Sequence, residues 1–161
     1  MKRFLAAAAA VGVLLGQHAW AATQSTTINV SAQVDGGCTV NTTPLQFLSV
    51  ASGATPTDTT ATVNVNCTNG LAYYVGLDYG QYGVGQQRYM NGTVSGDKLE
   101  YNLYSDAAHN TAWGNTLSVN TVQGVGSGAQ QPLTVYGEIP GSQIGMADDN
   151  YSDTVTVTVT Y

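Results

Sequence analysis

Two cysteines and one histidine are the side chains best suited to covalent or metal chemistry beyond residue 21. Cys38 and Cys67 form no Cys-x-x-Cys pair, and His109 is the only imidazole in that part of the sequence. Structural zinc sites need four such ligands, so metal-bound thiols are disfavoured. In an oxidising compartment two thiols most simply form one disulfide. A loop of about 30 residues closed in this way stabilises a fold by roughly 3–4 kcal/mol.

No combination of side chains indicates catalysis. The sequence has neither a Gly-x-Ser-x-Gly nor a Walker motif, and the glycine-rich residues 124–129 lack the flanking strand and helix of a phosphate-binding loop. Asp148, Asp149 and Asp153 match no calcium-loop spacing. The ten tyrosines and Trp113 are more typical of core packing than of a sugar site. We therefore expect no enzyme and no catalytic, cofactor-binding or metal-binding residue.

The first 21 residues have the pattern of an export signal. Lys2 and Arg3 precede the apolar residues 4–15, and Ala19-Trp20-Ala21 is a small-x-small cleavage site. We expect residues 1–21 to be removed and the rest to be exported.

Positive charge is sparse in the remaining chain. Arg88 and Lys98 are its only Lys or Arg residues and face ten carboxylates, which gives a net charge of −8. Nucleic-acid binding requires a basic patch, so nucleic acid is not expected as a partner.

The positions that these residues occupy belong to short alternating segments, which predict an all-β sandwich. Alternation or apolar character marks the expected strands 27–34, 38–41, 45–50, 61–67, 72–79, 98–105, 133–139 and 151–161. Asn69-Gly70 favours a tight hairpin between 61–67 and 72–79. Residues 80–96 and 107–127 are expected to be irregular.

The segment 151–161 is the most regular of these strands. Val155, Val157, Val159 and Tyr161 occupy one face, and threonines occupy the other. No later segment is available to pair with one side of this strand, so we expect its sheet to be completed from outside.

Residues 27–34 alternate in the same way. Ile28, Val30, Ala32 and Val34 share one face, just after the predicted cleavage site and outside the loop between the cysteines. An alternating segment outside the closed loop has the pattern needed to add a strand to another sheet.

Several segments together resemble the spore coat protein U family, the secreted pilins of archaic chaperone–usher fimbriae. They are Leu45-Gln46-Phe47, residues 62–68 with Cys67, residues 74–80, Arg88-Tyr89-Met90, residues 101–106, Trp113-Gly114, residues 133–137 and residues 151–161. The combination spans nearly the whole predicted mature chain, and no single motif carries it.

The resemblance implies an immunoglobulin-like sandwich (residues 37–161) that lacks its final strand. It implies that residues 22–36 donate a strand to a neighbouring subunit, with Ile28, Val30, Ala32 and Val34 as the inserted side chains. The acceptor groove and chaperone-binding edge would then lie along Val155, Val157, Val159 and Tyr161. The implied partners are further copies of the chain, other pilus subunits, a periplasmic chaperone and an outer-membrane usher. The implied role is a cell-surface fimbrial subunit for attachment and biofilm formation.

Two other interpretations fit the same residues. In a secreted monomeric binding module, residues 27–34 would close their own sandwich. In a coat protein, the subunits would cover a cell or spore without forming fibres.

Overall fold

The computed structural model describes residues 24–48, 50, 55–143 and 145–161. The chain separates into two units, Met1–Gln33 and Val34–Tyr161. In the first unit, residues 24–33 form no strand and their side chains are exposed. The predicted export signal lies outside the described residues. In the described part of the chain, no helix is long and apolar enough to cross a membrane.

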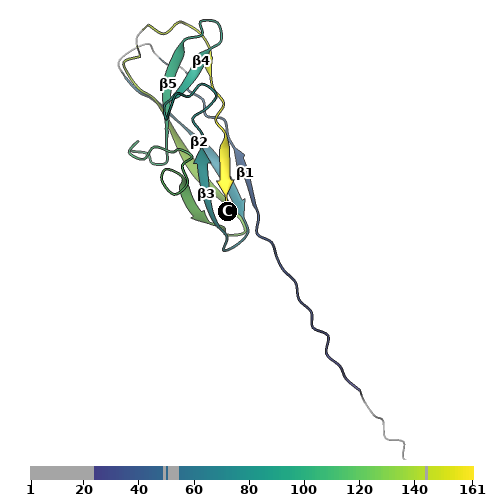
Figure 1. Ribbon diagram of the computed structural model, residues 1–161. Helices are drawn as coiled ribbons and strands as arrows, with labels where there is room; N and C mark the ends of the chain where they lie inside the picture. Colours follow the sequence, from purple (N-terminus) through teal and green to yellow (C-terminus); the bar gives the residue numbers. More distant parts are fainter. Residues whose placement is uncertain (1–23, 49, 51–54, 144) are drawn as a thin grey trace, which may run out of the picture. The chain divides into compact units, whose positions relative to one another are not determined.

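The described residues contain strands and no helix, as the alternating sequence predicts (Figure 1). In chain order the strands are β1 (Cys38–Thr42), β2 (Thr57–Cys67), β3 (Ala72–Leu77), β4 (Arg88–Gly92), β5 (Lys98–Tyr104), β6 (Val122–Val125), β7 (Gln130–Ile139), β8 (Tyr151–Ser152) and β9 (Val157–Thr160).

The strands form two sheets, and every pairing between them is antiparallel. The larger sheet has the order β1-β2-β7-β5-β4-β8, and the smaller has the order β6-β3-β9. Two sheets that bury one face each against the other make a β-sandwich. The predicted all-β sandwich is therefore confirmed.

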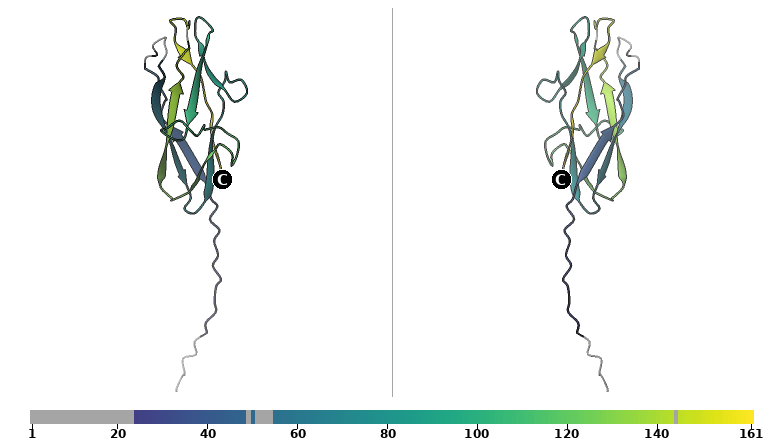
Figure 2. Two further views of the ribbon diagram at one scale, coloured as in Figure 1. Left: turned by 90° about the vertical axis from the view of Figure 1, so that its left-hand side faces the viewer. Right: turned by 90° about the vertical axis from the view of Figure 1, so that its right-hand side faces the viewer.

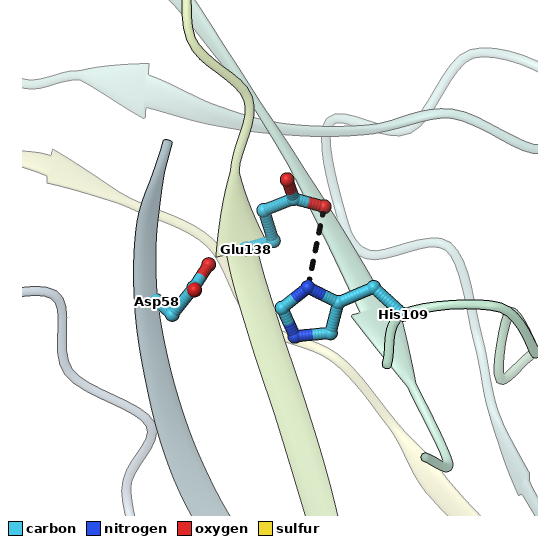
Figure 3. A group of neighbouring side chains, drawn as sticks. All are labelled: Asp58, His109 and Glu138. Atoms are coloured by element: carbon cyan, nitrogen blue, oxygen red, sulfur yellow. Dashed lines mark ion pairs between the residues drawn. The ribbon is translucent and has the colours of Figure 1, made fainter. Parts of the chain in front are cut away.

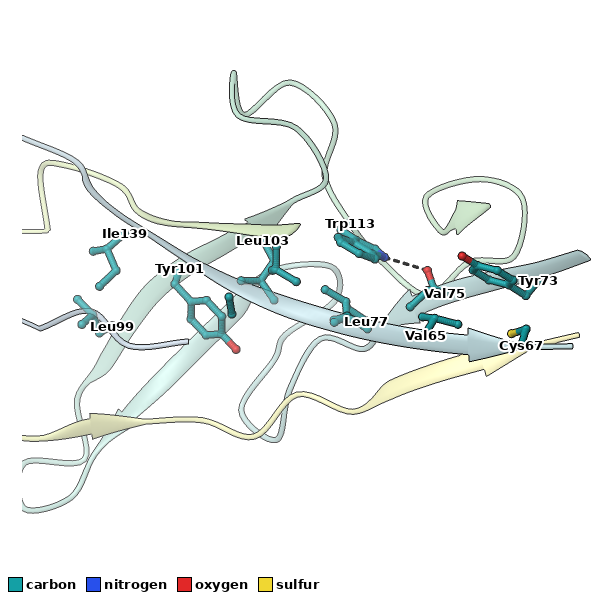
Figure 4. Packing of buried hydrophobic residues seen from close by; sticks show 13 residues of the cluster. Val65, Cys67, Tyr73, Val75, Leu77, Leu99, Tyr101, Leu103, Trp113 and Ile139 are labelled. Carbon is teal, nitrogen blue, oxygen red and sulfur yellow. Dashed lines mark hydrogen bonds between the residues drawn. The ribbon is translucent and has the colours of Figure 1, made fainter. Parts of the chain in front are cut away.

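The core lies between the sheets and is built from alternate residues (Figure 4). In β2, Val63, Val65 and Cys67 are almost completely buried, whereas the residues between them are not. Trp113 fills the middle of the core, and its indole Nε1 donates a 2.9 Å hydrogen bond to the Val75 carbonyl. A buried indole N–H usually finds such a partner, so the tryptophan is fixed in orientation as well as in place.

Two segments expected to be irregular contain strands. β4 lies within residues 80–96 and β6 within residues 107–127. Both are short, and their more buried positions include Arg88 and Gly92 in β4 and Gly124 in β6, so neither shows the alternation of apolar and polar residues that predicts a strand.

The expected hairpin at Asn69-Gly70 is wrong. The turn is present and Gly70 has the positive φ of 82° that the motif favours. However, β2 pairs with β1 and β7, while β3 pairs with β6 and β9. The turn therefore carries the chain from one sheet to the other.

The expected strand at 45–50 is also wrong where the structure describes it. Leu45 and Phe47 instead lie over β7 at Gly137, where an added Cβ would be only 2.9 Å from Leu45 Cδ1. The backbone carbonyl of Gln46 accepts a 2.9 Å hydrogen bond from the Thr59 hydroxyl. Side-chain packing and side-chain hydrogen bonds thus replace a strand ladder in this segment.

The segment 151–161 is not one strand but two. β8 pairs with β4 in the large sheet, and β9 pairs with β3 in the small sheet. The break begins at Asp153, the one polar residue on the apolar face of the sequence pattern. The predicted alternation itself holds, since Val155, Val157 and Val159 are half-buried and pack against the core.

Candidate binding groove

One edge strand of each sheet, β1 in the large sheet and β9 in the small sheet, lies on the same side of the sandwich. Among the described residues, β1 pairs only with β2, and β9 pairs only with β3. β1 and β9 nevertheless lie near each other (Figures 1 and 2). In the described part of the chain, no strand is paired with the free edge of either.

A groove with a volume of about 320 Å³ opens into the core at this point. One wall is formed by Thr42, the last residue of β1, and by Thr43, Pro44, Leu45 and Phe47 after it. The other is formed by Asp153, Thr154 and Val155, which precede β9, and by Val157, its first residue. Its floor consists of side chains from five strands: Ala61, Val63, Leu77, Met90, Tyr101, Leu103 and Val135. Apart from Thr62, which also lines the groove, and the Tyr101 hydroxyl, the floor is apolar, so the groove suits aliphatic side chains.

The wall before β9 is held by Asp78 at the end of β3. The Asp78 amide donates to the Thr156 carbonyl at 3.0 Å, and the Thr156 amide donates to Asp78 Oδ1 at 2.8 Å. The Gly80 amide donates to the same carboxylate oxygen at 3.0 Å. Burial alone would raise the pKa of Asp78, but the hydrogen bonds from Thr156 and Gly80 outweigh it and lower the pKa. The ionised carboxylate thus extends the β3–β9 pairing by one more residue.

One end of the groove is polar. Asp153 Oδ2 accepts a 2.6 Å hydrogen bond from the Tyr101 hydroxyl, and Oδ1 accepts a 2.9 Å bond from the Gln81 amide. Burial, and then the hydrogen bond to Asp153, raise the pKa of Tyr101 far above its ordinary value. Asp153 is therefore anchored to β5 of the large sheet and to the loop that follows β3, where the chain crosses between sheets.

Arg88 lies beneath this region and is only 4% exposed. Its guanidinium donates to the carbonyls of Asp78, Leu77 and Trp113 at 2.8–2.9 Å. It also lies 5.0 Å from the centre of the Tyr79 ring. Burial lowers the pKa of Arg88, although nearby Tyr101, Tyr79 and the carboxylates act in the opposite direction. The buried cation thus joins the carboxyl end of β3 to the loop that carries Trp113.

The opposite wall is fixed through β1. Cys38 and Cys67 are directly opposed in the β1–β2 ladder and form a disulfide. Past the end of β1, the Thr43 amide donates to the Thr62 carbonyl at 2.9 Å, and the Thr62 amide donates to the Thr43 hydroxyl at 2.8 Å. The predicted disulfide is present, and it holds the strand that leads into this wall.

The four residues predicted to border a groove do not have equal roles. Val155 and Val157 line it. Val159 is half-buried farther along β9, and Tyr161 is 61% exposed beyond the strand. The sequence did not identify Leu45 and Phe47 as the opposite wall, although both belong to the Leu45-Gln46-Phe47 segment that resembles the family.

The four predicted donor residues are described and exposed. Ile28, Val30 and Val34 are 85%, 90% and 83% exposed, and Ala32 is also exposed. Residues 24–37 form no strand. The chain thus carries an uncovered row of alternating apolar side chains.

Comparison with known proteins identifies the family. The family model of the Spore Coat Protein U domain matches residues 24–158. Protein U of Myxococcus xanthus is 31% identical over 172 aligned positions, which cover 97% of this chain and 95% of Protein U.

A solved structure shares the fold. It is the CsuC–CsuE chaperone–tip adhesion subunit pre-assembly complex from archaic chaperone–usher Csu pili of Acinetobacter baumannii, with a TM-score of 0.60 and 21% identity. The match covers 80% of this chain but 40% of that chain, so this protein spans less than half of its structural neighbour. The family match extends through both walls of the groove, and the chain therefore belongs to the Spore Coat Protein U domain family.

Proposed function

We propose that this protein is a structural subunit of an archaic chaperone–usher fimbria and polymerises by donor-strand exchange. One observation carries the proposal: an apolar groove opens beside the unpaired edge of β9, in a chain that also carries an exposed alternating segment at 27–34. The groove is the acceptor and the segment is the donor.

The groove has both requirements of a strand-addition site. An unpaired strand edge offers backbone groups for a new ladder, and a pocket beside it accepts alternate side chains. Left open, such an edge invites uncontrolled association. A donor strand along β9 covers the edge and fills the space over Val63, Leu77 and Leu103.

The exposed segment supplies a matching set of side chains. Fully burying one Val or Ile side chain is worth about 1.5–3 kcal/mol, so three such residues and Ala32 provide a substantial driving force. Part of that energy offsets the ordering of a chain segment that has no strand structure of its own. Because donor and groove are different surfaces, the contact is heterologous and repeats along a fibre.

The partners follow from the same groove. Before assembly, a chaperone strand occupies the edge of β9, and an outer-membrane usher catalyses its replacement by the donor of the next subunit. The structural neighbour is a chaperone–subunit pre-assembly complex, which supports a chaperone-bound stage before assembly. The path requires export to the periplasm directed by residues 1–21, which are then removed, and it ends at the cell surface in attachment and biofilm formation.

Size-exclusion chromatography with light scattering tests the proposal. The form comprising residues 22–161 is compared with a form that lacks residues 22–33. We expect the longer form to make polymers that resist detergent and the shorter form to stay monomeric. A peptide of residues 22–36 is then added to the shorter form and should bind with one peptide per subunit.

If both forms are monomers that ignore the peptide, donor-strand assembly is wrong. The protein is then a monomeric secreted module.

A coat protein that forms no fibres is the second candidate. The matching relative is Protein U, and the family is described as a spore coat domain. Electron microscopy of the polymers distinguishes the two, because thin filaments support a fimbria and sheets or amorphous layers support a coat.

A further inference from the structure

Three potential metal ligands meet on the outer face of the large sheet, away from the groove. Asp58 of β2 and Glu138 of β7 are directly opposed in the ladder, and His109 comes from the loop that follows β5. One ligand atom from each residue lies within 4.8 Å of the other two. Figure 3 shows the three side chains pointing toward one another.

The two carboxylates have little positive charge to balance them. Like charges directly opposite each other in a ladder destabilise the pair. The imidazole Nδ1 of His109 lies 3.8 Å from Glu138 Oε2, too far for a hydrogen bond. Arg88 is engaged with buried carbonyls, and Lys98 lies over the Tyr82 ring. A bound cation would remove the repulsion between these carboxylates.

Besides Glu138, the histidine contacts Tyr104, and the loop that carries it is fixed by Asp106. Its ring stacks on Tyr104 with ring centres 4.9 Å apart. The Asp106 carboxylate accepts hydrogen bonds from the amides of Ala108, Asn110 and Thr111, which fix the loop around it. The imidazole is 21% exposed and Glu138 is 19% exposed, so both are partly sheltered from water. This loop therefore presents the ring to the two strands in one orientation.

We propose that Asp58, His109 and Glu138 bind one Zn²⁺ ion. Zinc binds imidazole nitrogen and carboxylate oxygen at about 2.0–2.2 Å, which puts neighbouring ligand atoms roughly 3.3–3.6 Å apart. The 3.8 Å separation of His109 and Glu138 is close to that value. The imidazole favours zinc over calcium or magnesium, which prefer oxygen ligands alone. Three protein ligands leave a fourth position for water or for a group from another molecule.

This site departs from the sequence expectation of no metal ligand. The three residues are far apart in the sequence and match no metal-binding spacing. Only the register that opposes Asp58 to Glu138 and the loop that carries His109 bring them together.

Isothermal titration of Zn²⁺ into the protein without a histidine tag tests the site. We expect one ion per chain, and a fall in affinity of at least tenfold for His109→Asn, Asp58→Asn and Glu138→Gln. Asparagine tolerates the positive φ of 55° at position 109, so the first variant removes the ring without straining the loop. Asp148→Asn, which removes an exposed carboxylate elsewhere, is the control and should bind normally. The visible spectrum of bound Co²⁺ reports whether the coordination is tetrahedral.

The proposal is overturned if the wild-type protein takes up no Zn²⁺, or if His109→Asn binds as well as the wild type. Binding of the donor peptide is measured on the same variants and should not change, because the groove shares no residue with this cluster. Failure of the zinc site is thereby separated from failure of the assembly mechanism.

Discussion

Tyr101 donates a 2.6 Å hydrogen bond to Asp153, and this bond joins the floor of the groove to the point where the chain crosses between sheets. Tyr101 comes from β5 in the large sheet and is 4% exposed. Asp153 follows β8 and begins the wall that leads into β9. The pair therefore couples the position of β9 to the packing of the core.

Loss of the Tyr101 hydroxyl should destabilise the sandwich. Tyr101→Phe removes a hydrogen bond to a charged group, which is worth about 1.5–3 kcal/mol of unfolding free energy. Tyr74→Phe is the matched control, because the Tyr74 hydroxyl has no hydrogen bond among those seen in the described residues. Urea unfolding measures both changes. Equal stability of the two variants would show that the bond to Asp153 contributes nothing.

Stability should also fall at alkaline pH because of the same tyrosine. Burial, and then the bond to Asp153, raise the pKa of Tyr101 in the folded state. An unfolded tyrosine loses its proton near pH 10, whereas the folded residue keeps it. The stabilisation is thus complete below about pH 10 and declines by about 1.4 kcal/mol per pH unit above it. Unfolding curves from about pH 9 to 11 should show a shallower decline for Tyr101→Phe, and identical slopes would contradict the assignment.

A charge on the apolar face of the donor should prevent assembly. Val30→Asp would bury an unpaired carboxylate, a cost of at least about 2 kcal/mol or roughly thirtyfold in affinity. Asn29→Asp adds the same charge on the opposite face and should bind almost normally. Both changes are made in the peptide of residues 22–36 and measured with the form lacking residues 22–33. A similar loss from both variants would mean that net charge, and not the face, determines binding.

Filling the groove should block the donor without unfolding the protein. Ala61 lines the groove floor, and Ala61→Leu extends an aliphatic side chain into its open volume. We expect thermal stability to change little and the affinity for the donor peptide to fall at least tenfold. Ala72→Leu, on an exposed position of β3, is the control. Unchanged peptide affinity for Ala61→Leu would place the donor elsewhere.

Removing the disulfide should weaken the wall that begins at β1. In the Cys38→Ala, Cys67→Ala double variant, the unfolded chain can adopt more conformations. For a loop of about 30 residues this lowers the free energy of unfolding by roughly 3–4 kcal/mol. Hydrogen exchange at Thr43 and Thr62 should increase, because their mutual hydrogen bonds lie just past β1. The level of protein in the periplasm gives a second readout. Stability and exchange equal to those of the oxidised protein would show that the ladder alone holds β1.

The sequence was sufficient where alternation and burial coincide. β2 and the terminal segment present their apolar residues to the core as predicted, since the period of a strand fixes which side chains share a face. The same reasoning could not reveal which strands are neighbours. Asn69-Gly70 encodes a turn, but a turn of that kind can also join two sheets.

Only one of the two walls of the groove could be predicted from the sequence. Val155 and Val157 followed from alternation, whereas Leu45 and Phe47 pack without a strand and so leave no periodic signal. Asp153 interrupts the alternation of this segment. The acidic residue on the apolar face lies at the point where the chain leaves one sheet for the other. The cluster of Asp58, His109 and Glu138 depends on register and had no signal at all.

The pairing of β3 with β9 has a consequence for the speed of folding. Leu77 and Val157 are opposed in the ladder although 80 residues separate them in the chain. Sheets built from such distant partners fold slowly, on the scale of milliseconds to seconds for sandwiches. β9 follows the other strands of the described chain, so Val75 and Leu77 lack their partners Val159 and Val157 until this last strand has emerged. Until β9 has emerged, the nascent subunit thus exposes the apolar edge of β3, which no other strand among the described residues covers.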